Sequence, residues 1–135
     1  MKALIIGAAR SGIAITKLLV KEGYSCILLD QKTVDSSQFE SLKSIEIIEG
    51  KHPEYLWDET FDLIIKNPGI PHTNEFVQGF VKKGYFIYNE IEIALRFASK
   101  YQVGAITGTN GKTTTTTMLE ALLKKKNTRN TACGN

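Results

Sequence analysis

Cysteine and histidine are scarce in this chain. The only cysteines among its 135 residues are Cys26 and Cys133, and the only histidines are His52 and His72. A disulfide framework or a zinc site needs several such residues at short spacing, and none of the four has a neighbouring cysteine or a carboxylate cluster. The sequence therefore predicts neither a disulfide-stabilised secreted domain nor a metal site built from cysteine and histidine. Each histidine adjoins a proline, and we expect both at the surface.

Long apolar runs and a strong net charge are also missing. The opening Met1-Lys2 leads into a short apolar run that ends at Gly7, so no signal peptide or membrane-spanning segment is predicted. The net charge of +3 is small, and Lys124-Lys125-Lys126 is the one basic run. At the end of a predicted helix, such a run is explained by its favourable interaction with the helix dipole rather than by binding to nucleic acid. We expect a cytoplasmic protein with no nucleic-acid or membrane partner.

What the chain does contain is an alternation of short apolar runs with amphipathic segments. Strands are predicted over residues 3–6, 26–29, 45–48, 63–65, 85–88 and 103–106, and helices over 12–21, 37–43, 75–82, 90–98 and 112–126. The strand segments are continuously apolar, which is typical of a parallel sheet buried on both faces. Their alternation with helices predicts an α/β fold, a Rossmann-like doubly wound parallel sheet.

A domain boundary is predicted near residues 99–102, after the helix that Asn89 is expected to cap. The expected domains are 1–100 and 101–135. The second holds one strand, one loop and one helix, and such a unit cannot bury its own faces. We therefore expect residues 101–135 to be the start of a larger, truncated domain, and the chain to be the amino-terminal portion of a longer protein.

A phosphate-binding loop is predicted between the last strand and the last helix. It comprises Gly108, Thr109, Asn110, Gly111, Lys112, Thr113 and Thr114. The small residues let backbone N–H groups face phosphate oxygens, the helix adds its positive N-terminus, and Lys112 adds a full charge. Thr113 would place a hydroxyl on Mg²⁺. The first glycine of the usual Walker pattern is replaced by Ile106, so the loop is a shortened variant; the alternative is an ordinary glycine-rich turn.

Two further loops follow predicted strands. After the first comes Gly7-Ala8-Ala9-Arg10-Ser11-Gly12, which lacks the middle glycine of the dinucleotide fingerprint, and Asp30 ends the second strand where an acidic residue could meet a ribose hydroxyl. A nucleotide site and a structural turn both remain open here. After the fourth strand, Lys66-Asn67-Pro68-Gly69-Ile70-Pro71 would face the same edge of the sheet, although a simple turn accounts for it as well.

Together these segments resemble the Mur ligase family. The resemblance covers essentially the whole chain and depends on Gly-x-x-x-Ser-Gly, on Asn-Pro-Gly-Ile-Pro, on Glu90-Ile91-Glu92 and on Thr-Gly-Thr-Asn-Gly-Lys-Thr-Thr. It is nearest to the branch that joins D-glutamate to UDP-N-acetylmuramoyl-L-alanine in peptidoglycan synthesis. In this family the first domain holds the UDP end of the substrate, the central domain binds ATP with Mg²⁺, and a third domain binds the amino acid.

The resemblance also implies site residues. The UDP-substrate site would contain Arg10, Ser11, Asp30, Gln31, Lys32, Asn67, Pro68, Gly69 and Asn135. The ATP site would be the loop from Gly108 to Thr114, with Lys112 on the β- and γ-phosphates and Thr113 near Mg²⁺. Other catalytic groups of the family lie beyond the end of this chain, so the resemblance implies that the 135 residues alone are inactive.

Departures from the family and rival functions both concern these loops. Ala9 stands where the family often has glycine, and Lys66-Asn67 where some members have serine. A Mur ligase for another amino acid is a close alternative, because amino-acid selection belongs to the third domain. A nicotinamide-dependent oxidoreductase would use the first loop and Asp30 but leave Lys112 unexplained. A non-catalytic nucleotide-binding module is the remaining alternative.

Overall fold

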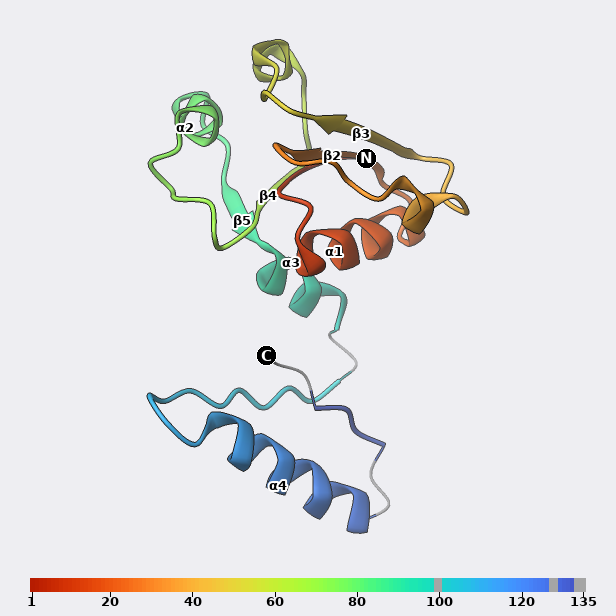
Figure 1. Ribbon diagram of the computed structural model, residues 1–135, viewed down its shortest axis with the longest axis vertical. Coiled ribbons are helices and arrows are strands. Elements are labelled where there is room, and N and C mark those ends of the chain that lie inside the picture. Colours follow the sequence, from red (N-terminus) through yellow and green to blue (C-terminus); the bar gives the residue numbers. More distant parts are fainter. Residues whose placement is uncertain (99–100, 127–128, 133–135) are drawn as a thin grey trace. The chain divides into compact units, whose positions relative to one another are not determined.

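The structure of the chain is a computed structural model that describes residues 1–98, 101–126 and 129–132. Two compact units divide the chain, Met1–Lys100 and Tyr101–Asn135. The first contains the sheet and most helices, and the second contains one long helix (Figure 1). No helix among the described residues is long and apolar enough to cross a membrane.

The first unit is built on five parallel strands. They are β1 (Lys2–Ile6), β2 (Ser25–Asp30), β3 (Ile45–Glu49), β4 (Leu63–Lys66) and β5 (Ile87–Asn89), in the spatial order β3-β2-β1-β4-β5. Ile6 at the end of β1 pairs with Leu29 of β2 and with Lys66 of β4, so these three strands end at one edge. The Rossmann-like, doubly wound parallel sheet predicted from the sequence is confirmed.

Helices cover both faces of this sheet (Figure 1). Helices α1 (Arg10–Lys21) and α3 (Glu90–Phe97) pack on one face, where Ile15, Leu19 and Ile93 meet Ala3 and Ile5 of β1. On the other face, α2 (Glu75–Lys82) and the short 3₁₀ helix η2 (Glu54–Asp58) cover the remaining side chains of the strands. The strands are apolar on both sides because each side meets its own helical layer.

Helix α3 begins as the sequence predicted. The Asn89 side chain accepts a hydrogen bond from the Glu92 amide at 2.9 Å, and the Glu92 carboxylate accepts one from the Asn89 amide at 2.8 Å. This capping box satisfies two amides that the helix itself cannot pair. It also fixes where Glu90, the first residue of α3, stands at the carboxyl edge of the sheet.

Some predicted elements differ. The helix expected over 37–43 is only a 3₁₀ turn, η1 (Ser36–Phe39), because Asp35 caps it locally and Phe39 is its one buried residue. The strand expected over 85–88 is found at Ile87–Asn89. The 3₁₀ helix η2 was not predicted; it follows Pro53, and its Leu56 is fully buried.

The second unit holds α4 (Lys112–Lys125), close to the predicted helix, and none of its residues is buried. Residues 103–106 form no strand. A strand satisfies its backbone groups by pairing with a neighbour, and the described residues of this unit contain no other strand. The strand was predicted from an apolar run, and those residues contain no second strand that could pair with it.

Candidate functional site

The candidate site lies where the order of the sheet reverses. Strands β1 and β4 are neighbours, but their connections lead away in opposite directions, and ligands of open α/β sheets bind in the crevice at this point. A cavity of about 320 Å³ opens there. Its walls come from the loops after β1, β2, β3 and β4: Gly7, Ala9, Asp30, Gln31, Lys32, His52, Asn67, Gly69, Ile70, Pro71 and Asn74.

Asp30 holds the first two loops together. One carboxylate oxygen accepts a hydrogen bond from the Ala8 amide at 2.6 Å, and the other accepts one from the Lys32 amide at 2.8 Å. Gly7 makes the turn with φ of 104°, and an added Cβ would stand 2.7 Å from the Cβ of Asn67. Only glycine therefore allows the loops after β1 and β4 to approach so closely.

The N-terminus of α1 faces this region with free hydrogen-bond donors. Ala9 caps the helix without any side-chain hydrogen bond, and no acidic residue stands in the first turn. The first amides of a helix lack intrahelical partners and carry partial positive charge, so they attract anions. Lys32 lines the same cavity and adds a cation. The arrangement suits a ligand that carries phosphate groups.

Two predicted site residues point their side chains at a third residue. The Ser11 hydroxyl donates to Glu90 Oε1 at 3.0 Å, and the Asn67 amide nitrogen donates to the same oxygen at 2.9 Å. The Asn67 carbonyl oxygen accepts the Gly69 amide at 2.9 Å. The sequence indicated Glu90 only as one residue of a motif, and the contacts place it at the base of these loops.

The predicted UDP-site residues thus divide into two groups. Asp30, Gln31, Lys32, Asn67 and Gly69 line the cavity, whereas Arg10, Ser11 and Pro68 do not. Ser11 still joins the group through Asn67 and Glu90. Asn135 lies outside the described residues. No group of three or more potential metal ligands occurs among His, Cys, Asp and Glu in the described ranges.

His52 is a cavity residue that the sequence analysis missed. It was expected at the surface, as is found for His72, but it is half-buried, and its ring lies 4.6 Å from that of Phe76. Burial lowers the pKa of His52, and the nearby Asp30 charge opposes this shift. No local pattern in the sequence indicated this, because α2, which carries Phe76, follows more than twenty residues later.

The pKa shift of His52 predicts a pH dependence of stability. The unfolded chain takes up the proton near the ordinary value of 6.5, whereas the folded chain takes it up only at lower pH. The free energy of unfolding should therefore rise with pH between the lowered pKa and 6.5, and His52→Gln should flatten this rise. Urea unfolding of both proteins from pH 5 to 8 measures it. An identical slope in the variant would contradict this assignment.

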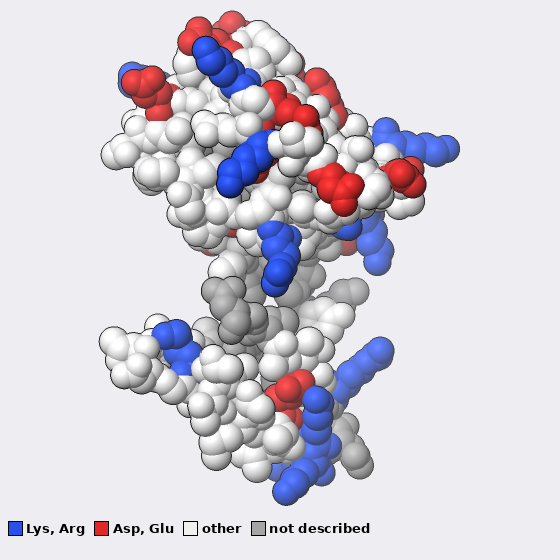
Figure 2. Space-filling view, in the orientation of Figure 1, with Lys and Arg blue, Asp and Glu red and all other residues white. Residues whose placement is uncertain are grey.

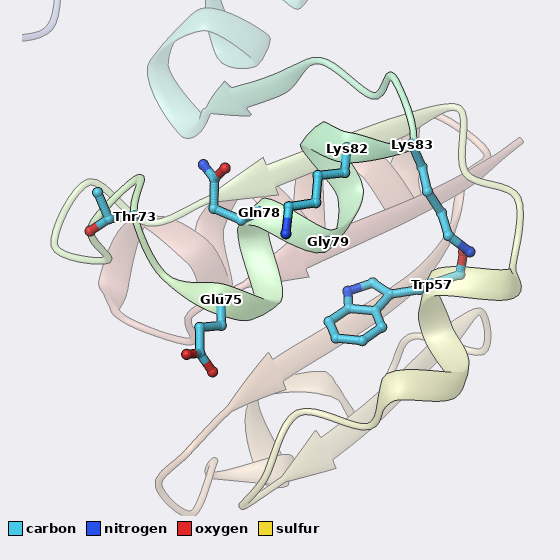
Figure 3. Close-up of a pocket in the computed structure, with 7 residues that line it drawn as sticks. All are labelled: Trp57, Thr73, Glu75, Gln78, Gly79, Lys82 and Lys83. Atoms are coloured by element: carbon cyan, nitrogen blue, oxygen red, sulfur yellow. The ribbon is translucent and has the colours of Figure 1, made fainter.

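A larger groove of about 590 Å³ lies elsewhere on the first unit, between η2 and α2 (Figure 3). The Trp57 ring lies against Gly79, where an added Cβ would come within 2.3 Å of the ring. The Trp57 indole N–H donates to the Phe76 carbonyl at 3.0 Å, and Lys83 donates to the Trp57 carbonyl at 2.6 Å. These polar groups already have partners within the protein, and no predicted site residue lines the groove.

The predicted phosphate loop belongs to the second unit. Gly111 caps α4 in the left-handed conformation, with φ of 78° and no side-chain cap, so the first amides of α4 lack a side-chain acceptor. Lys112 curls back over the loop, and its ammonium donates to the carbonyls of Gly108 and Thr109, the latter at 3.3 Å. The loop residues are exposed. The unit is basic, as Figure 2 shows: within 101–132 there are four lysines and one arginine, Lys112, Lys124, Lys125, Lys126 and Arg129, against Glu120.

Comparison with known proteins gives a consistent result. The chain is 42% identical over 127 residues to the UDP-N-acetylmuramoylalanine--D-glutamate ligase of Geobacillus kaustophilus, which covers 91% of this chain and 28% of that protein. The ligases of the same name from Ligilactobacillus salivarius and Bacillus subtilis are 44% and 40% identical, over 97% and 98% of this chain. No protein-family model matches. The chain spans about 30% of the length of these curated relatives.

Proposed function

The chain belongs to the family of the UDP-N-acetylmuramoylalanine--D-glutamate ligases, and we propose that it holds the substrate and the ATP phosphates in such a ligase. Residues 1–100 would form the domain that binds the UDP end of UDP-N-acetylmuramoyl-L-alanine. Residues 101–135 would begin the ATP-binding domain. The complete enzyme would add D-glutamate in peptidoglycan synthesis, in the cytoplasm.

One observation supports the first assignment above the others. Five of the residues implied by the family resemblance, Asp30, Gln31, Lys32, Asn67 and Gly69, line a single cavity at the reversal point of the sheet. They come from two loops that are more than thirty residues apart. The free amides at the start of α1 and the Lys32 ammonium would meet the diphosphate, while the remaining cavity would hold the nucleoside.

The second assignment depends on the loop before α4. The amides of this loop and the Lys112 ammonium would surround the β- and γ-phosphates of ATP. Mg²⁺ in such sites keeps several waters and is held by one or two protein groups plus the phosphates, so the Thr113 hydroxyl suits it without a cluster of carboxylates. The bound ion would neutralise charge on the transferring phosphoryl group.

The proposed reaction has two steps. The γ-phosphate of ATP passes to the substrate carboxylate, which gives an acyl phosphate and ADP. The amine of D-glutamate then attacks the carbonyl carbon, forms the amide bond and releases phosphate. Phosphoryl transfer depends on positioning and charge neutralisation, which is the role proposed for Lys112. The 135 residues alone are expected to bind ligand without turnover, and a product assay with ATP and both substrates checks this.

Parallel titrations test the proposal. We expect UDP to shift the amide NMR signals of Gly7 to Ser11 and of Asp30 to Lys32 in the 135-residue chain. The control is Asp35→Asn, which removes an exposed carboxylate at the N-cap of η1, outside the cavity. NAD that shifts the same signals, with no response to UDP, would overturn the ligase assignment and favour an oxidoreductase. ATP-Mg²⁺ is expected to shift only the amide signals of residues 108–114.

A further inference from the structure

Glu90 is a buried carboxylate beneath the candidate site. Only 4% of the residue is exposed, and it stands at the start of α3, directly after β5. A buried charge is costly unless hydrogen bonds or dipoles compensate for it. Here the positive end of α3 and two side-chain donors surround the carboxylate, while Oε2 is buried without a hydrogen-bond partner. Such a group needs an explanation beyond the stability of α3.

The contacts of Glu90 join the starts of two helices and one loop. Its Oε1 accepts from the Ser11 hydroxyl at 3.0 Å and from the Asn67 amide nitrogen at 2.9 Å, and Asn67 also lies 3.3 Å from the Ser11 hydroxyl. Ser11 is in the first turn of α1, and Asn67 follows β4. One carboxylate oxygen at the start of α3 therefore connects the first turn of α1 with the loop after β4 at the edge where the cavity opens.

Most of the Asn67 side chain is engaged within the protein. Its amide nitrogen lies 2.9 Å from Glu90 Oε1 and 3.3 Å from the Ser11 hydroxyl, and these two acceptors are 3.0 Å apart, so they lie on the same side of the amide group. The side-chain oxygen accepts the Gly69 amide at 2.9 Å. These contacts fix the shape of the loop after β4, and Asn67 acts on a ligand through that shape.

We propose that Glu90 is a positioning residue for the ligand cavity. By holding the Ser11 and Asn67 side chains, it sets where the α1 N-terminus and the Pro68-Gly69 turn face the phosphates of a nucleoside diphosphate. Ser11 and Asn67 then act on the ligand through Glu90 and through the position of the backbone. The inference rests on the proposed function, since the phosphates are those of UDP.

The experiment compares UDP affinity in the 135-residue chain and its variants by amide NMR titration. Glu90→Ala removes the acceptor, and we expect UDP to bind about tenfold more weakly. Glu90→Gln keeps a carbonyl oxygen for both donors and should stay within about threefold of the original affinity. Glu92→Gln is the matched control, because it makes the same charge change two residues further along, and glutamine at that position still completes the capping box of α3.

A double-substitution cycle separates positioning from general destabilisation. If Glu90 acts through Asn67, then Glu90→Ala combined with Asn67→Ala should bind UDP no more weakly than the weaker single variant. Thermal unfolding of each variant checks that the fold remains. Two outcomes would overturn this inference alone. In one, the affinity loss of the double variant equals the product of the two single-variant losses. In the other, Glu90→Ala binds UDP as tightly as the unchanged chain. Failure of the unchanged chain to bind UDP would overturn the proposed function and this inference with it.

Discussion

Replacing Gly12 with alanine is expected to lower the free energy of unfolding by about 3 kcal/mol. Gly12 is buried in the first turn of α1, and a Cβ added there would come within 2.0 Å of the Gly7 carbonyl oxygen. Both atoms belong to the tight connection between β1 and α1, so neither can move as a flexible side chain would. The helix must shift away from the turn, and packing against Ile5 would loosen.

Chemical denaturation of the variant beside the unchanged chain measures this loss. Gly104→Ala is the matched control, because a Cβ at that position meets nothing within 4 Å. We expect the control to change stability by less than about 0.5 kcal/mol. Equal stability of Gly12→Ala and Gly104→Ala would contradict the close approach of α1 to the Gly7 turn.

The same substitution has a consequence for binding. The α1 amides that face the cavity move with the helix, and oriented donors lose strength steeply when their geometry changes. We therefore expect Gly12→Ala to weaken UDP binding even under conditions in which the variant is fully folded. A structural glycine and the ligand site are coupled here because one turn serves both.

Replacing Lys112 with alanine is expected to reduce ligase turnover by about 10²- to 10³-fold. The lysine supplies the one side-chain cation within residues 108–114, where the γ-phosphate of ATP would lie. In the structure its ammonium donates to the Gly108 and Thr109 carbonyls, which shows that it reaches over the loop. Phosphate oxygens would replace these carbonyl contacts and gain a charge-assisted hydrogen bond.

Measurement requires a complete enzyme, such as a chimera in which this chain replaces the matching 28% of the Geobacillus kaustophilus ligase. Lys124→Ala on the same helix is the control. Its exposed ammonium pairs with the half-buried Glu120 at 2.9 Å near the far end of α4, and such surface pairs contribute little. We expect this control to retain turnover. Full activity of Lys112→Ala would remove the loop from the proposed phosphate-transfer step.

The sequence was a good guide wherever the structure depends on neighbouring residues. The continuous apolar runs predicted a parallel sheet buried on both sides, and the strands from Lys2 to Ile6 and from Leu63 to Lys66 confirm it. Asn89 as the expected N-cap predicted the start of α3 for the same reason, since a cap acts within one helical turn, and the structure adds Glu92 as its capping-box partner. The alternation of strands and helices also predicted a doubly wound sheet, and in the structure its order reverses between β1 and β4.

The sequence was a poor guide wherever a group needs a distant partner. The apolar run at 103–106 reads as a strand, but without a neighbouring strand among the described residues it stays unpaired. His52 looked like a surface residue, but it lines the cavity, and its ring lies 4.6 Å from that of Phe76 on α2. The spacing of apolar residues predicts which face of a helix or strand a residue occupies. It does not predict which residues of other elements contact that face.

By itself, then, the sequence determined the fold class, the positions of the three glycine-containing loops and the family to which the chain belongs. Only the tertiary structure decided which predicted residues meet. It joined Ser11 and Glu90, which are 79 positions apart, by one hydrogen bond, and it brought the side chain of Asn67, which lines the cavity, to the same Glu90 oxygen. The physical reason is that local propensities act over a few residues, whereas a buried carboxylate takes its partners from whichever loops the sheet brings to its edge.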